Sequence, residues 1–193
     1  MTANELMSAL AERLRDPTRL AHNDADLLRA LSLAQQSVNA AEEAVFDTTD
    51  FTTVPNVSIY PVLGYLPKAI KIVSVRQQER DLMPVSLGQL READIQWLRR
   101  KGGRFEEYAV IGRGMLAFYP LVNVGVTLSV RYLKHTDNLT APTSVVELGD
   151  EYVPTVLGFA ELLLSLRQRK FQQVQPLAEA MARFMGGDGG AEG

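Results

Sequence analysis

The feature that most constrains the fold of this chain is a change in hydrophobic spacing near Asp47. From Asp24 to Phe46, apolar residues recur every three or four positions, a pattern typical of an amphipathic helix. Asn23 favours a helix start there because its side chain can accept a hydrogen bond from the first turn. After Asp47, β-branched residues dominate, and Pro55 and Pro61 divide the chain into short extended pieces. The change predicts helices and strands in different parts of the chain.

The middle of the chain, residues 47–135, has the spacing of a β structure. A polar turn at residues 77–80 separates two strand-like segments, which predicts a hairpin. Ser86 and Asp94 each precede a short helical pattern that they can cap. The clearest alternation of apolar and polar residues runs from Val126 to Leu133. The expected strands are residues 70–76, 81–85, 108–111, 115–120 and 124–133.

Helical patterns return at both ends of the chain. The first helix is expected from Asn4 to about Arg15, where Asp16 and Pro17 stop it. The last strong helix follows Asp150 and tolerates Pro154 in its first turn. It is apolar on nearly every side, so it needs cover all round, and a neighbouring subunit supplies that cover more easily than one small domain. The candidates for a subunit interface are Leu157, Phe159, Leu162, Leu163 and Leu166.

The C-terminal part adds a further amphipathic segment. Apolar residues at helical spacing run from Phe171 to Phe184, and Pro176 marks a kink or a new start. The Gly-rich residues 186–193 are predicted to be disordered. The whole pattern predicts an α+β fold, with a helical layer and an antiparallel β-rich middle, as one structural domain with a C-terminal extension. Its expected parts are N-terminal helices (1–46), the β-rich middle with short helices (47–135), C-terminal helices (136–185) and the tail (186–193).

Composition limits the classes of function. A chain of 193 residues with 46% hydrophobic content can bury a core. Its formal charge of -3 argues against wholesale nucleic-acid binding, although such a total can hide a local basic face. Without cysteine it has no disulfide, thiol nucleophile or thiolate metal site. The start lacks a signal-peptide pattern, and the longest apolar tract, residues 156–166, is too short to span a bilayer. We expect a soluble protein of cytoplasmic origin.

The sequence offers no catalytic constellation. Its two histidines, His22 and His135, lie before a helix and after a strand, and we interpret both as solvated loop residues. The carboxylates of Glu106-Glu107 are adjacent on a strand and would point to opposite faces. The segment Gly112-Arg113-Gly114 lacks the Lys-Ser/Thr pair and the following helix of a phosphate loop. We therefore predict no enzyme activity, no cofactor and no metal site.

A basic cluster around Trp97 supports an alternative function, a nucleic-acid-binding module. Its cations can neutralise phosphates while the indole stacks on a base. A second interpretation is a solvated turn whose tryptophan is buried, since nothing spaces the cations as a known reading helix. Both interpretations stay open at this point. The cluster runs from Arg91 to Arg104 and contains Arg91, Arg99, Arg100, Lys101 and Arg104.

Several motifs, each weak alone, occur in an order that resembles one protein family. They are Tyr65-Leu66-Pro67 before Ile70 and Val73, Leu82 to Leu90 as a strand and then a short helix, Leu116-x-Phe118-x-Pro120 before Val130-x-Tyr132, and Tyr152 near the start of a C-terminal helix. A long N-terminal helix and a Thr-rich strand precede them. Over roughly Asp24 to Arg169, the chain resembles the head-to-tail adaptor, or connector, proteins of tailed bacteriophages.

The resemblance implies a structural virion protein at the neck, the head-tail junction, made in the host cytoplasm. Copies would form a ring, expected to hold twelve, on the portal protein after DNA packaging. The ring would prolong the DNA channel and present a surface to the tail or nozzle protein, with no membrane partner. Arg99, Arg100, Lys101 and Arg104 would face an acidic partner or the packaged DNA, which they would contact passively. A segment that orders on a partner suits portal docking, and its candidate residues are Phe171, Val174, Leu177, Met181 and Phe184.

Overall fold

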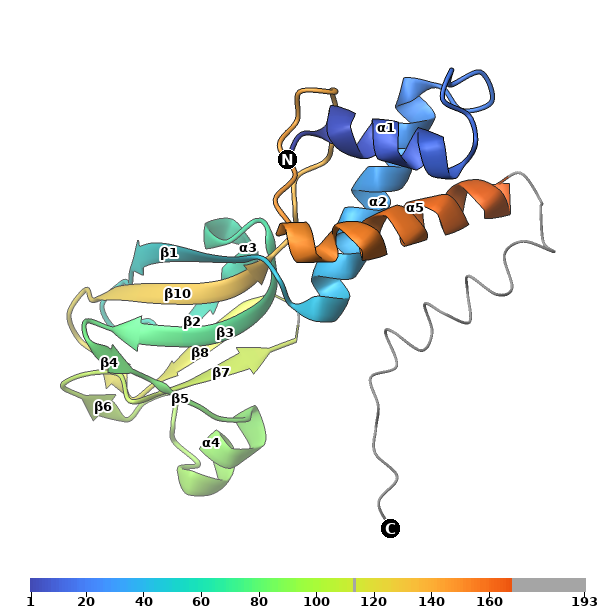
Figure 1. The fold of residues 1–193 in the computed structure, drawn as a ribbon. Helices are drawn as coiled ribbons and strands as arrows, with labels where there is room; N and C mark the ends of the chain where they lie inside the picture. Colours follow the sequence, from blue (N-terminus) through green and yellow to red (C-terminus); the bar gives the residue numbers. More distant parts are fainter. Residues whose placement is uncertain (113, 168–193) are drawn as a thin grey trace, which may run out of the picture. The chain divides into compact units, whose positions relative to one another are not determined.

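The computed structural model describes residues 1–112 and 114–167, apart from the side chains of Val62 and Leu63. The chain forms two compact units (Figure 1). The helical unit contains residues 1–45 and 136–193, and the β unit contains residues 46–135. The β unit is therefore an insertion in the sequence of the helical unit. The chain passes between the units twice, after Val45 and after His135.

The described part of the helical unit is built from both ends of the chain. Its elements are α1 (Ala3–Arg13), α2 (Asp24–Glu42), the 3-10 turn η1 (Asp150–Tyr152) and α5 (Val153–Arg167). The N–H of Thr2 donates to the carboxylate of Glu5 at 2.7 Å, which closes a capping box at the start of α1. The side chain of Asn23 accepts from the N–H of Asp26 at 2.9 Å, as its place in the sequence predicts.

The three helices bury one shared apolar core. Full burial of each leucine in it stabilises the fold by about 1.5–3 kcal/mol, and this term outweighs helix propensity. The buried side chains of the core include Leu6, Leu10, Leu27, Leu31, Ala160 and Leu164, all at most 3% exposed.

Helix α2 is shorter than the sequence pattern suggests. Glu43 adopts a left-handed conformation with φ of 49°, and the helix ends at Glu42. The side chain of Asn39 accepts from the N–H of Val45 at 2.8 Å. The predicted helical end at Phe46 is therefore wrong, because a polar side chain within the helix ties down the turn that follows. Phe46 instead begins the first strand.

Buried polar side chains of α2 also hold the loop that precedes η1. Ser32 accepts from the N–H of Leu139 at 2.8 Å, and Gln35 donates to the carbonyl of Asp137 at 3.1 Å. Ser32 and Gln35 are 7% and 0% exposed, so these bonds satisfy groups that are costly to bury alone. The loop is thus a fixed part of the helical unit.

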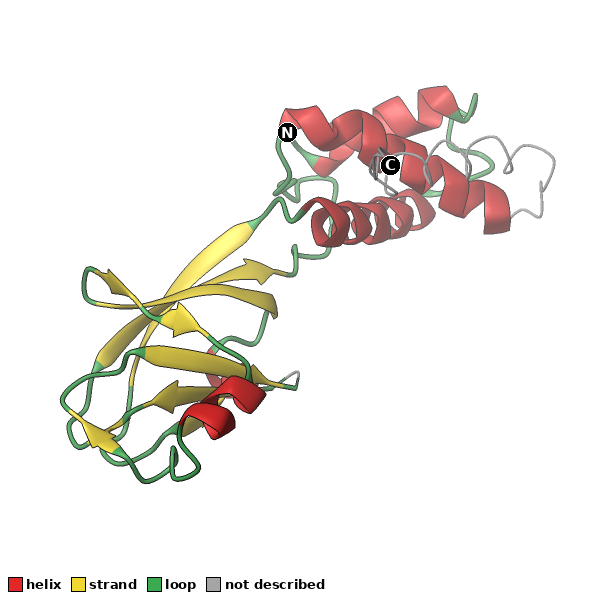
Figure 2. Ribbon diagram, turned by 90° about the horizontal axis from the view of Figure 1, so that it is seen from below, coloured by secondary structure: helices red, strands yellow, loops and turns green. Residues whose placement is uncertain are grey.

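Two four-stranded sheets form most of the β unit (Figure 2). One has the order β1 (Phe46–Thr52), β10 (Thr127–Lys134), β3 (Ala69–Gln77) and β4 (Arg80–Asp81). The other has the order β2 (Ile59–Pro61), β8 (Met115–Tyr119), β7 (Glu107–Ile111) and β5 (Met83–Pro84). A further pair joins β6 (Lys101–Gly102) to β9 (Leu121–Val122), and the helices are α3 (Val62–Tyr65) and α4 (Leu87–Ala93).

Alternation along the strands fills the core of the β unit. Leu128, Val130 and Tyr132 of β10 are all at most 5% exposed, as their spacing predicts. Leu66 is 1% exposed, and the ring of Tyr65 packs on Phe51 with centroids 5.0 Å apart. The predicted α+β class is confirmed: the strands are largely antiparallel, and α1, α2 and α5 lie toward the ends of the chain.

Two local predictions in the β unit are wrong. Only β4 pairs with β3 in the expected hairpin, since the chain then leaves that sheet and β5 pairs in parallel with β7. The helix expected after Asp94 is instead a series of turns, in which the N–H of Trp97 donates to the carbonyl of Asp94 at 3.0 Å. Ser86 caps α4 as predicted, with its side chain accepting from the N–H of Gln89 at 3.2 Å.

Candidate assembly surfaces

Helix α5 is partly covered by its own unit. Leu157 and Leu162 are 7% and 8% exposed, whereas Leu166 is 42% exposed and Phe159 and Leu163 are half-buried. Two of the five candidate interface residues, Leu157 and Leu162, are therefore already buried within the chain. Of the five candidate interface residues, Phe159, Leu163 and Leu166 keep surface that a neighbour can cover.

A shallow groove between α2 and α5 extends this exposed apolar surface. Its volume is about 290 Å³, and Ala30, Leu33, Leu163 and Leu164 contribute its apolar walls. Arg29 lies on the rim, as does an ion pair between Arg167 and Asp26. Leu33 is 46% exposed, and sequence reasoning missed it. The helical spacing could have identified Leu33, because it does not lie on the face of α2 that carries the buried apolar residues.

The basic turn, residues 94–104, has a rigid frame. The side chain of Asp94 accepts from the N–H of Gln96 at 2.9 Å, and Arg100 lies 3.6 Å from its carboxylate. Trp97 is 5% exposed and packs in a small core with Leu90. This core lies against the face of the β2-β8-β7-β5 sheet that points away from the main core of the β unit. The indole therefore cannot stack on a base, and the interpretation of a buried tryptophan is the right one.

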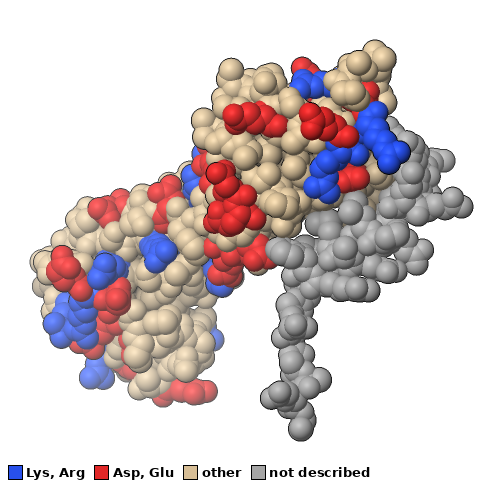
Figure 3. Space-filling model, viewed as in Figure 1, with Lys and Arg blue, Asp and Glu red and all other residues tan. Residues whose placement is uncertain are grey.

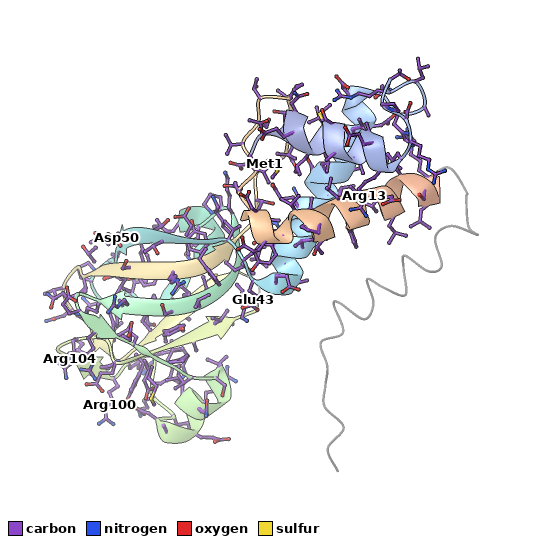
Figure 4. The ribbon with its side chains drawn as sticks, in the orientation of Figure 1. Met1, Arg13, Glu43, Asp50, Arg100 and Arg104 are labelled. Atoms are coloured by element: carbon purple, nitrogen blue, oxygen red, sulfur yellow. The ribbon has the colours of Figure 1, made fainter. Side chains whose placement is uncertain are left out.

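The cations of the basic turn stay at the surface around this anchor. The side chains of Arg100 and Arg104 are 66% and 60% exposed (Figure 4), and Arg104 reaches Glu106 at 4.0 Å. Two apolar side chains accompany them, since Ile95 is 91% and Leu98 is 46% exposed. The turn therefore presents both positive charge and apolar surface, of which the sequence prediction recognised only the charge.

One histidine departs from its predicted setting. His22 is 7% exposed and lies 3.4 Å from Asp16, whereas His135 is exposed as expected. Burial raises the pKa of the Asp16 carboxyl, but hydrogen bonds from the N–H groups of Leu20, Ala21 and His22 outweigh burial and hold that pKa below its ordinary value. This pair closes the loop between α1 and α2.

The described residues give no sign of a metal centre or of a membrane span. Within residues 1–112 and 114–167, no three His, Asp or Glu side chains gather as metal ligands would. In the same part of the chain, no helix is both long enough and apolar enough to cross a bilayer. The predicted docking segment, with Phe171, Val174, Leu177, Met181 and Phe184, lies outside the described residues.

Comparison with known families agrees with the arrangement of motifs. The profile of the family described as SU10 adaptor protein matches residues 1–189. The chain belongs to the SU10 adaptor family. The resemblance to phage head-to-tail adaptors is thereby confirmed, and the SU10 adaptor family gives the chain a structural, adaptor role in a bacteriophage. A comparison with curated proteins found no match.

Proposed function

We propose that this SU10 adaptor forms a ring, of twelve copies, beneath the portal protein at the neck of the virion. The ring prolongs the DNA channel and presents a surface to the tail or nozzle protein, and its contact with packaged DNA is passive. The observation that carries the proposal is the family match over residues 1–189. A ring needs two different surfaces on each subunit, since each copy meets one neighbour on either side.

Two features of the helical unit support an assembly role. Leu33 in the groove between α2 and α5, and Leu166 in the last turn of α5, are almost half exposed and provide apolar surface that a neighbour can bury. Residues 168–193 follow directly from Arg167 on its rim, and they include the amphipathic segment from Phe171 to Phe184. We propose that this segment is the portal-docking arm and that the exposed face of α5 meets a neighbouring subunit.

Electron microscopy of the purified chain, alone and mixed with the portal protein of the same phage, tests the proposal. We expect ring-shaped particles on the portal, with a mass that corresponds to twelve copies of the 21.3 kDa chain. A chain that stays monomeric and leaves the portal bare would refute the ring.

A further inference from the structure

The formal charge of the chain divides unequally between its two units. The helical unit, residues 1–45 and 136–193, has fifteen acidic and eight basic residues, which gives -7. The β unit, residues 46–135, has eight acidic and twelve basic residues, which gives +4. A molecule with two oppositely charged units attracts further copies of itself, because unlike units of different copies can meet.

Within the helical unit, the cations lie toward one end. In its described residues they are Arg13 and Arg167, the last residues of α1 and α5, together with Arg15, Arg19 and Arg29 around the start of α2. Arg13 pairs with Glu161 at 3.1 Å, and Arg19 pairs with Asp24 at 2.8 Å. Figure 3 shows the blue side chains of the helical unit gathered over this end.

The other end of the helical unit presents carboxylates. The ion pair between Arg167 and Asp26 brings the end of α5 to the start of α2, so the start of α5 lies toward the end of α2. Glu42 is the last residue of α2, and Asp150 and Glu151 form the turn before α5. All three side chains are exposed, and the five described arginines of the helical unit belong to the segments at its other end.

The basic turn lies near the end of β1 that is opposite to the first chain crossing. Strand β1 runs from Phe46, at one crossing, to Thr52, and the N–H of Asn56 then donates to the carbonyl of Val122 at 2.8 Å. Gly102 in the basic turn pairs with the same Val122. Seven residues of strand span roughly 23 Å. The basic turn therefore lies about one strand length from Phe46.

The basic turn is also preorganised for a protein partner. Trp97 anchors it in a core and Asp94 fixes its backbone, so Ile95 and Leu98 are held outward at little entropic cost. The outer surface of duplex DNA is lined by phosphates, on which two aliphatic side chains next to cations gain little. A protein surface with exposed carboxylates suits them better.

We propose that the basic turn of one copy docks on the carboxylate end of the helical unit of the next copy, through Arg99 and Lys101 against Glu42 and Glu151. The proposal rests on the proposed ring and assigns the charged contact between its subunits. The contact is head-to-tail, as a closed ring requires, because the two surfaces belong to different parts of the chain. The turn thus has a protein partner rather than a nucleic acid.

A charge swap tests the chemistry of the contact. R99E/K101E should lower the self-association constant at least tenfold at 0.1 M salt, measured by sedimentation with and without the portal protein of the same phage. Adding E42K/E151K to the same chain should restore association to within about threefold of wild type. All four positions are exposed, so an unchanged melting temperature shows that each variant folds.

Engineered cysteines test the location, because the chain contains no cysteine of its own. A chain with both Arg99→Cys and Glu42→Cys should form a ladder of disulfide-linked oligomers under oxidising conditions. The matched control pairs Arg99→Cys with Arg13→Cys, at the basic end of the helical unit, and should stay largely monomeric on the same gel.

The outcomes separate this contact from the ring itself. Wild-type rings, with no effect of R99E/K101E and no ladder specific to Glu42, would overturn the contact and leave the ring. A wild-type chain that does not associate, even with portal protein, would overturn both. Tight binding of duplex DNA by the wild type, lost in R99E/K101E without recovery of association by the swap, would assign the turn to DNA.

Discussion

A substitution at Leu166 can distinguish an effect on assembly from an effect on folding. We predict that Leu166→Asp leaves the helical unit folded but prevents the chain from occupying the portal. The matched control on the same helix is Leu164→Ala. Leu164 is 3% exposed within its own unit, whereas Leu166, in the last turn of α5, keeps 42% of its surface exposed. The two residues therefore distinguish a surface that waits for a partner from one that the chain already covers.

The magnitudes follow from the exposed fractions. Full burial of a leucine is worth about 1.5–3 kcal/mol, so a neighbour that covers the exposed 42% of Leu166 gains about 0.6–1.3 kcal/mol. A carboxylate buried there without a partner adds at least about 2 kcal/mol. The total of about 3 kcal/mol weakens each contact roughly 100-fold. Folding of the monomer loses only about 1–2 kcal/mol, while Leu164→Ala costs it about 2–5 kcal/mol.

The assay combines urea unfolding, followed by circular dichroism, with the occupancy of portal particles in electron micrographs. We expect Leu166→Asp to lose occupancy at temperatures where it is fully folded. Leu164→Ala should lose occupancy only as it unfolds. Wild-type occupancy of Leu166→Asp would show that no neighbour covers this face, and destabilisation as large as that of Leu164→Ala would place Leu166 in the monomer core.

Three further predictions concern other parts of the chain. Deletion of residues 171–193 should abolish portal binding, measured by co-sedimentation, with little change in melting temperature; full binding by the shortened chain would remove the arm from the mechanism. Asn39→Ala should lower the free energy of unfolding by about 1–3 kcal/mol in urea, because the partly buried N–H of Val45 loses its acceptor, and an unchanged free energy would mean that water replaces the Asn39 side chain. Asp16→Asn should destabilise the chain above about pH 4. The folded-state pKa of Asp16 is depressed, so the difference in stability between wild type and Asp16→Asn should shrink as the pH falls through that pKa. A difference in stability that persists in acid would contradict a stabilising role of the Asp16 carboxylate charge.

The sequence predicts correctly those elements in which the spacing of apolar residues, or a local capping residue, agrees with the structure. The alternation of β10 and the caps at Asn23 and Ser86 follow from local chemistry, and each is found where it is expected. The end of α2 could not be predicted in this way. Apolar spacing continues through Val45, and the signal that stops the helix is a hydrogen bond that the buried Asn39 accepts from the N–H of Val45 in the following turn.

The candidate assembly surfaces could likewise be predicted only in part from the sequence. The charge of the basic turn is legible in the sequence, since Arg99, Arg100 and Lys101 are consecutive. The burial of Trp97 and the exposure of Ile95 depend on which side of the turn meets the outer face of a sheet, and no local pattern encodes that choice. The cover of Leu162 is likewise set by tertiary packing, which hydrophobicity alone does not reveal.

The insertion of the β unit into the helical unit sets the order in which the chain can fold on the ribosome. Helices α1 and α2 emerge first, but their core needs Val156, Ala160 and Leu164 of α5. About 90 residues separate α2 from the loop that leads to α5, and at roughly 5–20 residues per second their synthesis takes on the order of 10 s. The β unit is contiguous and can close during that interval. The first helices to be made are therefore among the last elements to be secured, and their apolar faces are open to chaperones until residue 167 has left the exit tunnel.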